Sequence, residues 1–241
     1  MVVLRKPGKP HYNIPKAYRP IALLNTIWKV LMAIVANHIT FLAEKHQLLP
    51  ANHFGGRPGR MTTDTLHLLT HKIKGAWCIG KVAAVLFLDI EGAFPNTVPA
   101  RLIHNLRKQG LPHKYIDFID GMLRDRVTTL KFNGYISSPI EIDNRIGQGD
   151  PLSMVMYQFY NADLVDIPSS KSEDTLAYVN NTILLTTADT FNKAHKKLYS
   201  IMTRQRGVAD WSKTYNSPLK YSKLMLINFA YRSNCKERAT L

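Results

Sequence analysis

The nine residues 82-VAAVLFLDI-90 constrain the fold more than any other stretch of the chain. They form a continuous apolar run that ends in a single acid, Asp89. A short run rich in Val and Leu and apolar on both faces is typical of a strand buried inside a sheet. A carboxylate at the end of such a strand is unfavourable unless it is hydrogen-bonded, paired or metal-bound. Asp89 therefore either caps backbone amides or serves a function, and the run alone leaves both readings open.

The elements around this strand predict an α+β domain. Asn25 can cap a helix over about 26–48, whose apolar face we expect to be buried. Asn133-Gly134 predicts a hairpin within 127–142, and Asn180-Asn181 predicts the two-residue turn of a second hairpin over 175–187. The expected buried face of the first helix is Ile27, Val30, Leu31, Ile34, Val35 and Ile39. Other predicted elements are helices near 62–74, 97–109, 112–124, 151–164 and 190–213, and a strand at 223–229. We expect an antiparallel sheet covered by helices on one face.

Charge is concentrated in the first third of the chain. The 241 residues carry a formal net charge of +15. Residues 1–80 hold 11 Lys/Arg and 2 Asp/Glu (+9), and residues 81–241 hold 21 and 15 (+6). This distribution favours a polyanionic partner for the first third, with a merely soluble basic surface as the alternative.

The sequence gives little indication of a metal site or of secretion. Cys78 and Cys235, the two cysteines, offer neither a disulfide framework nor a metal cluster. His67 and His71 are spaced i, i+4 but lack a third ligand, so we discount a metal there. No signal-peptide pattern opens the chain, and the apolar run 27–39 is too short to span a bilayer. We expect an intracellular protein, nuclear or cytoplasmic, that is not secreted and has no membrane partner.

Several motifs in series carry a resemblance to a known family. They are 18-YRPIALLNTIWKV-30, 53-HFGGRPGRMTTD-64, 86-LFLDIEGAF-94, 148-QGDPLS-153, 178-YVNN-181 and 222-SKLMLINF-229. In these residues and their order the chain resembles the reverse transcriptase domain of a non-LTR (LINE-type) retrotransposon. The resemblance covers essentially the whole chain. It implies a right-hand polymerase palm preceded by mostly helical fingers, with residues 1–80 as partial fingers and 81–241 as palm. Elements at about 97–145 would connect the two, and the thumb would be missing.

The resemblance also implies a two-metal centre. Two Mg²⁺ ions in such chemistry require converging carboxylates. By the matching motifs Asp89 is the first metal ligand, whereas Asn180 and Asn181 stand where the family has two aspartates. Asn keeps the shape of Asp but loses its charge, and Gly92 makes it doubtful that Glu91 shares the face of Asp89. We therefore expect impaired Mg²⁺ binding and polymerase activity that is very weak or absent.

Other positions match the family's nucleotide and nucleic-acid contacts. The resemblance implies that Arg19 and Lys223 act on the incoming nucleotide, that Phe94 excludes a ribose 2′-OH and that Gln148 lies against the nucleotide. A surface Arg, a core Phe and a solvated Lys are the alternatives for Arg19, Phe94 and Lys223. Arg57 and Arg60 are predicted to bind nucleic acid. Pro95 replaces the family's usual Asp.

The resemblance implies an RNA template, a DNA primer and deoxynucleotide triphosphates as partners. The function that we expect is that of a truncated, inactive reverse transcriptase domain, a pseudoenzyme. Three alternatives remain at this point. One is a weakly active polymerase, another is a non-catalytic module that binds RNA or RNA/DNA hybrid, and the third is a decaying gene copy.

Overall fold

The chain folds into two compact units in a computed structural model that describes residues 1–142 and 146–231. Met1–Leu48 and Phe94–Phe159 form the first unit, and Leu49–Ala93 and Tyr160–Leu241 form the second. Each unit is thus built from two separate stretches of sequence. The division into fingers (1–80) and palm (81–241) stays a prediction, and Cys235 lies outside the described residues.

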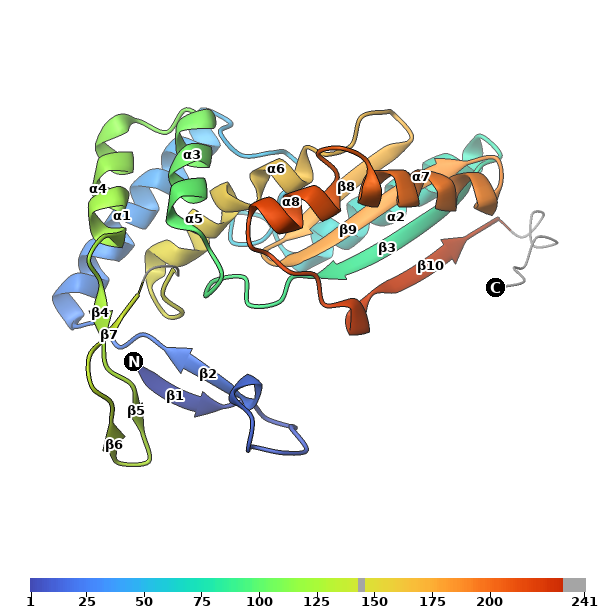
Figure 1. Cartoon of the computed structure of the whole chain (residues 1–241). Helices are drawn as coiled ribbons and strands as arrows, with labels where there is room; N and C mark the ends of the chain where they lie inside the picture. Colours follow the sequence, from blue (N-terminus) through green and yellow to red (C-terminus); the bar gives the residue numbers. More distant parts are fainter. Residues whose placement is uncertain (143–145, 232–241) are drawn as a thin grey trace. The chain divides into compact units, whose positions relative to one another are not determined.

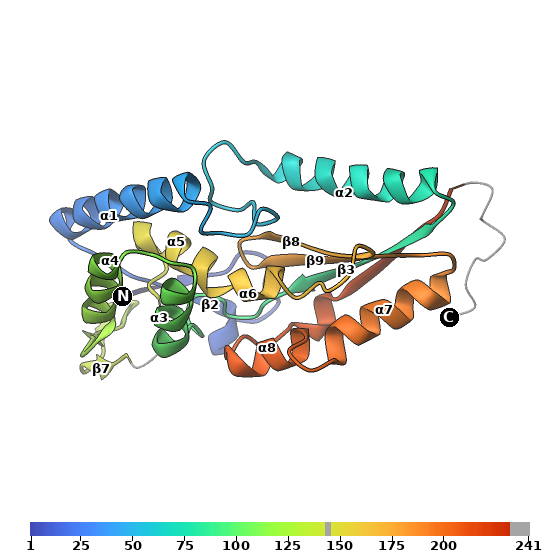
Figure 2. The ribbon, with the colours of Figure 1, turned by 90° about the horizontal axis from the view of Figure 1, so that it is seen from above.

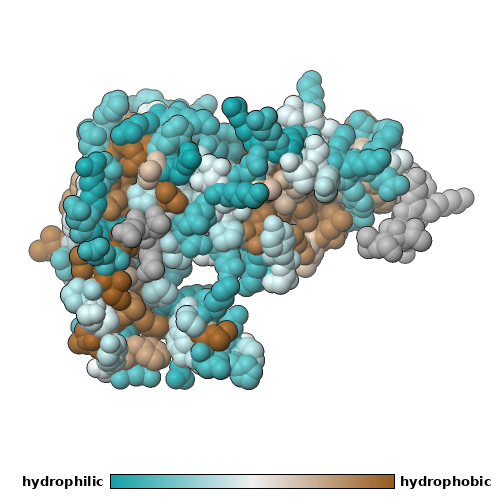
Figure 3. Space-filling model, viewed as in Figure 1, coloured by the Kyte–Doolittle hydropathy of each residue, from teal (hydrophilic) through white to brown (hydrophobic). Residues whose placement is uncertain are grey.

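The described residues of the first unit form small sheets, four α-helices and a short 3-10 helix, Pro15–Ala17, and the last α-helix ends one residue inside the second unit. Its elements are β1 (Val2–Arg5), β2 (Tyr18–Ile21), α1 (Thr26–Lys45), α3 (Pro99–Lys108), α4 (His113–Leu123), β4 (Val127–Thr128), β5 (Lys131–Phe132), β6 (Tyr135–Ile136), β7 (Ile140–Glu141) and α5 (Pro151–Tyr160). The strands form one sheet of order β2-β1-β5-β6 and a β4-β7 ladder. The predicted Asn133-Gly134 hairpin is confirmed between β5 and β6, where both residues have positive φ (47° and 81°). That conformation suits Asn and Gly. Hydrophobic atoms reach the surface near the β4-β7 ladder (Figure 3), where Val127 and Ile140 are exposed.

The buried face of α1 differs from the predicted one. Its buried residues are Met32, Ala36, Ile39 and Ala43. Ile27, Val30, Leu31 and Ile34 are exposed and Val35 is half-buried, so the predicted face is wrong for four of its six residues and only Ile39 is fully buried. Helix α1 is also long and apolar enough to span a membrane by length and composition, a weak criterion that core helices and signal sequences also meet. The argument against a membrane span from the length of residues 27–39 therefore does not hold.

The second unit is organised around a four-stranded antiparallel sheet of order β10-β3-β9-β8. Its elements are α2 (Thr62–Cys78), β3 (Val82–Asp89), α6 (Ala162–Val165), β8 (Glu173–Tyr178), β9 (Asn181–Ala188), α7 (Phe191–Thr203), α8 (Val208–Thr214), the 3-10 turn η2 (Tyr221–Lys223) and β10 (Met225–Phe229). Strand β3 lies inside this sheet, between β10 and β9 (Figure 1). The buried-strand prediction for residues 82–90 is confirmed, with Val82, Ala83, Ala84 and Val85 all at most 1% exposed.

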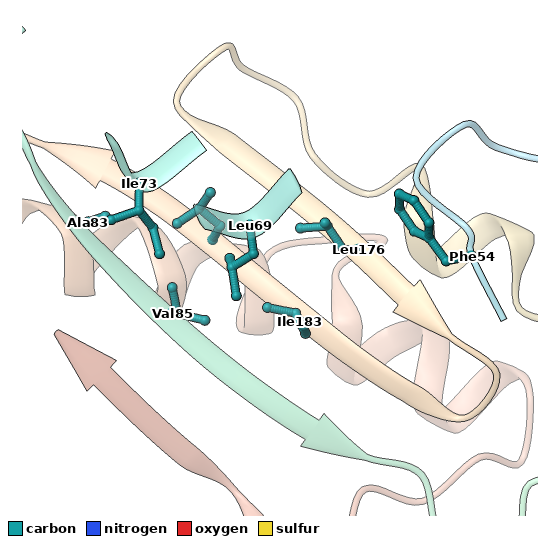
Figure 4. Packing of buried hydrophobic residues seen from close by; sticks show 8 residues of the cluster. Phe54, Leu69, Ile73, Ala83, Val85, Leu176 and Ile183 are labelled. Carbon is teal, nitrogen blue, oxygen red and sulfur yellow. The ribbon is translucent and has the colours of Figure 1, made fainter. Parts of the chain in front are cut away.

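Helices cover both faces of this sheet, so the prediction of helices on one face is wrong. Figure 2 shows α2 on one side of the strands and α7 on the other. On the α2 side, Leu69 and Ile73 pack against Val85 and Ile183 (Figure 4). On the opposite side the Thr186 hydroxyl donates to the Ala194 carbonyl of α7 (3.0 Å). Because β3 is apolar on both faces, each face needs such a cover.

Candidate functional site

The end of β3 meets the tip of the β8–β9 hairpin in the second unit. Asp89 pairs with Asn181 across the β3–β9 ladder, and Asn181 also pairs with Tyr178 across the hairpin. The two turn residues are therefore Val179 and Asn180, and Asn181 is the first residue of β9. This corrects the prediction that Asn180 and Asn181 form the turn. The register of β9 against β3 places Asn181 in the ladder, beside the last residue of β3.

Val179 holds the turn in a conformation that a β-branched residue rarely adopts. Its φ is +57°, and a left-handed backbone at Val is strained. Its carbonyl accepts a hydrogen bond from Asn161 Nδ2 (2.7 Å). A Cβ built on Gly55 would lie 2.4 Å from the Val179 nitrogen, so only glycine fits at that position. The backbone of Gly55 packs against the Val179 turn, and the Asn161 side chain is hydrogen-bonded to it.

A buried histidine extends this support. His53 Nε2 lies 2.9 Å from Asn161 Oδ1. Because the Asn161 amide nitrogen donates to Val179, Oδ1 is the acceptor and His53 Nε2–H is the donor. Burial lowers the pKa of His53 to about 4; the Asn161 hydrogen bond opposes this shift, and the charges of Arg57 and Arg60 add to it. His53 is therefore a neutral donor at physiological pH.

Two nitrogen donors contact the carboxylate of Asp89. Lys223 Nζ lies 2.7 Å from Oδ2, and Asn180 Nδ2 donates to Oδ1 over 3.3 Å. The side chain of Asp89 is only 18% exposed, so a partner of opposite charge is needed to offset its desolvation. The predicted catalytic positions Asp89, Asn180 and Asn181 thus lie together at the end of β3, and Lys223, predicted to act on the nucleotide, reaches the same carboxylate.

This donor set does not fit a two-metal centre. Mg²⁺ takes hard oxygen ligands, usually one or two protein carboxylates together with waters and phosphate oxygens, so two neighbouring ions call for several carboxylates. Here Asp89 supplies one carboxylate and the neighbouring turn supplies amides. Within residues 1–142 and 146–231, no group of three or more His, Cys, Asp or Glu side chains could hold a metal ion. Glu91 does not extend the set along the strand, because β3 ends at Asp89 and Gly92 has a φ of +62° in the turn that follows.

A cavity of about 310 Å³ opens beside Asp89 and Lys223. Phe87, Leu66 and Tyr178 contribute apolar walls, and Asn181 lines it too. Thr65 and Thr182 also line the cavity. Their hydroxyl groups are buried and have no hydrogen-bond partner in the described part of the chain. The site is thus a small hollow with apolar walls and one ion pair at its edge.

The remaining predicted nucleotide residues belong to the first unit. Arg19 is exposed on β2, and the Ala22 amide just after β2 donates to the Gln148 carbonyl (2.8 Å). Phe94 packs against Tyr157 with ring centroids 5.2 Å apart, and its carbonyl accepts from the Ile146 amide. The first unit therefore joins β2 to the Gln148 loop, and Phe94 has the partly buried setting of a packing residue. The nucleotide roles of these three residues stay predictions.

Arg57 and Arg60 hold the loop that carries His53. Arg57 is 7% exposed, and its Nη1 donates to the carbonyls of Pro50 (2.8 Å) and His53 (3.1 Å). Arg60 Nη1 donates to the carbonyls of Ala51 and His53, and its guanidinium lies over the Phe54 ring. The structure gives both residues a role in loop structure. The nucleic-acid role assigned to them stays a prediction.

Sequence reasoning missed the support behind the turn. His53 and Asn161 are 108 positions apart, and no spacing pattern links them. The one available signal was Gly55 in 53-HFGGRPGR-60, where consecutive glycines can mark a close approach of two backbones.

The sequence of this chain is similar to a known protein family and to several characterised relatives. The family model for "Reverse transcriptase (RNA-dependent DNA polymerase)" matches residues 4–227. A probable RNA-directed DNA polymerase from transposon BS of Drosophila melanogaster is 26% identical over 220 residues, which cover 89% of this chain and 24% of that protein. The RNA-directed DNA polymerase from the mobile element jockey of the same species is 23% identical and covers 97% and 25%. The chain thus spans about a quarter of the length of these relatives.

Solved structures share the fold. Telomerase from Candida albicans, in a complex with a fragment of telomeric RNA, superposes with a TM-score of 0.60 at 10% identity, covering 83% of this chain and 35% of that one. Apo telomerase from Candida tropicalis gives 0.59 at 10% identity, covering 86% and 37%. At this level of identity the likeness concerns the fold alone.

Proposed function

Because the chain belongs to the reverse transcriptase family, in the form found in non-LTR (LINE-type) transposons, we propose that it is a polymerase domain whose catalytic centre is inactive. One observation carries this proposal. At the tip of the β8–β9 hairpin the residues beside Asp89 are Asn180 and Asn181, and the Asp89 carboxylate is already held by an amide and an ammonium group. Two divalent ions need more negative charge than one paired carboxylate supplies.

Primer extension on an RNA template, with Mg²⁺ or Mn²⁺, tests the proposal. We expect the unaltered chain to give no more product than Asp89→Ala. Restoring the carboxylates with Asn180→Asp and Asn181→Asp should raise extension above that background, because the hairpin keeps its backbone. Asn133→Asp, in the β5–β6 turn, is a matched control that adds a carboxylate elsewhere and should change nothing. Clear incorporation by the unaltered chain that is lost in Asp89→Ala would refute inactivity.

We further propose that the domain retains affinity for an RNA template. The net charge of +15 supports this, as does the excess of basic residues in 1–80. Phosphate contacts release counterions, so log K should fall linearly with log salt concentration. Lys9 and Lys29 are exposed in the first unit, and Lys171 and Lys196 are exposed in the second.

A paired comparison of lysine variants tests RNA binding. Lys9→Gln with Lys29→Gln should make the salt slope shallower by roughly one to two units, about one for each phosphate that is no longer neutralised. Lys171→Gln with Lys196→Gln removes the same charge and should leave the slope nearer that of the unaltered chain. Fluorescence anisotropy with a labelled single-stranded RNA provides the measurement. An equal effect of both pairs would indicate diffuse attraction without a preferred surface in the first unit.

A further inference from the structure

The ion pair between Lys223 and Asp89 has a consequence beyond the missing carboxylates. We propose that Lys223 is an internal counter-ion for Asp89, which takes the electrostatic place that a divalent cation would need and so weakens metal binding at this carboxylate. This deepens the proposed loss of catalysis and rests on it for the identity of the site. It adds that the lysine itself opposes metal binding.

Both oxygens of the carboxylate are engaged. Oδ2 lies 2.7 Å from the Lys223 ammonium, and Oδ1 accepts from the Asn180 amide. An ammonium group has donors and no acceptor, so it cannot share a metal as a ligand. A cation approaching Oδ2 would have to displace Nζ and would be repelled by its charge.

Backbone contacts bring Lys223 to this position. The Lys220 amide donates to the Asp89 carbonyl (2.8 Å), and the Glu91 amide donates to the Pro218 carbonyl (2.8 Å). Just beyond Lys223, Met225 pairs with Phe87 as β10 joins the edge of β3. The segment that carries Lys223 is therefore fixed to the end of β3 on both sides, and the side chain has a short path to the carboxylate.

The charge balance at the site agrees with this role. Asp89 contributes one negative charge and Lys223 one positive charge, so the pair is neutral. The Lys223 side chain is 58% exposed and that of Asp89 is 18% exposed. The carboxylate thus gains most from the pairing, whereas the lysine remains free to move into solvent if a stronger competitor for the carboxylate is created.

Direct Mn²⁺ binding tests this role without any need for activity. The experiment uses the full chain and Mn²⁺ alone, with free Mn²⁺ followed by electron paramagnetic resonance. The reference is the Asn180→Asp, Asn181→Asp variant, in which we expect saturable binding. Adding Lys223→Met should tighten that binding by roughly tenfold, the size expected when one charged competitor is removed. Adding Lys220→Met instead removes an equal charge from a residue whose backbone, rather than its side chain, contacts Asp89, and should have a much smaller effect.

The outcomes separate the inference from the proposed function. Equal Mn²⁺ affinity with and without Lys223, in variants whose circular dichroism and melting temperature match the reference, would overturn the counter-ion role and leave inactivity standing. An equal gain from Lys220→Met would also overturn it. Tight saturable Mn²⁺ binding by the unaltered chain would contradict both ideas. Tighter binding in Lys223→Met alone, with Lys220→Met unchanged, supports the inference.

Discussion

Replacing Gly55 with alanine is expected to lower the free energy of unfolding by about 1–3 kcal/mol, the usual cost of overpacking. The added Cβ would lie 2.4 Å from the Val179 nitrogen and 2.9 Å from the Tyr178 carbonyl carbon. Both contacts are with backbone, so a side-chain rotation cannot relieve them. The hairpin tip must move, and Val179 is already strained at a φ of +57°. Urea denaturation followed by circular dichroism measures the change.

Two further glycines provide matched controls. Gly75 lies in α2 with no atom within 4 Å of its added Cβ, so Gly75→Ala should leave stability unchanged or raise it by up to about 1 kcal/mol through helix propensity. Gly207→Ala meets the Ile201 carbonyl oxygen at 2.5 Å and should destabilise the unit without moving the hairpin. Hydrogen exchange at the β8 and β9 amides should therefore quicken more in Gly55→Ala than in Gly207→Ala. A Gly55→Ala variant as stable as the unaltered chain would contradict the close packing at the turn.

Local signals predicted most of the elements. The apolar run 82–90 became β3, and Asn133-Gly134 became a turn with two positive φ values. In both cases a few neighbouring residues determine the backbone. The second hairpin was predicted as an element, but its turn is one residue earlier than expected. Asn is suited to either place, and the pairing of β9 with β3, which sequence spacing does not reveal, decides between them.

Faces were harder to predict than elements. Helix α1 is apolar almost all round, so periodicity could not select the face bearing Met32 and Ala36 over the one bearing Ile27 and Leu31. Helices were predicted on only one face of the β10-β3-β9-β8 sheet for a related reason. An apolar run such as 82–85 calls for cover on both sides, and only the packing of α2 and α7 shows which helices provide it.

Part of the candidate site followed from the order of the motifs. Asp89, Asn180 and Asn181 were expected to lie together, and the β3–β9 ladder and the hairpin tip bring them together. Lys223 was expected only to act on the incoming nucleotide. The direct contact of Lys223 with Asp89 could not be read from sequence, since it depends on how residues 218–223 return along β3. Arg57 was predicted to bind nucleic acid from its place in a glycine-rich loop, yet its side chain is buried. Its burial depends on the carbonyls of Pro50 and His53, whose direction the sequence does not specify.

Acid should weaken the second unit through His53. In the folded chain burial lowers the pKa of this imidazole to about 4 from the ordinary 6.5. The unfolded chain therefore binds more protons between these values, and stability falls as pH decreases through that window. The shift corresponds to a loss on the order of 2 kcal/mol between pH 7.5 and pH 5. The main physical cause is the desolvation of the buried imidazolium, to which the charges of Arg57 and Arg60 add. Nδ1 is also buried with no hydrogen-bond partner within the described residues, so a second proton there has no acceptor.

The variant His53→Gln isolates this contribution. Glutamine can still donate to Asn161 but does not titrate, so we expect some loss of stability at pH 7.5 and a flatter profile between pH 7.5 and pH 5. His67→Gln, at an exposed position of α2, should keep the pH dependence of the unaltered chain. Urea midpoints and slopes at each pH give the free energies. If His53→Gln and the unaltered chain lose the same stability on acidification, the imidazole is not the group that titrates. Another titrating group would then have to account for the acid sensitivity, and His53 would not be established as a neutral donor to Asn161.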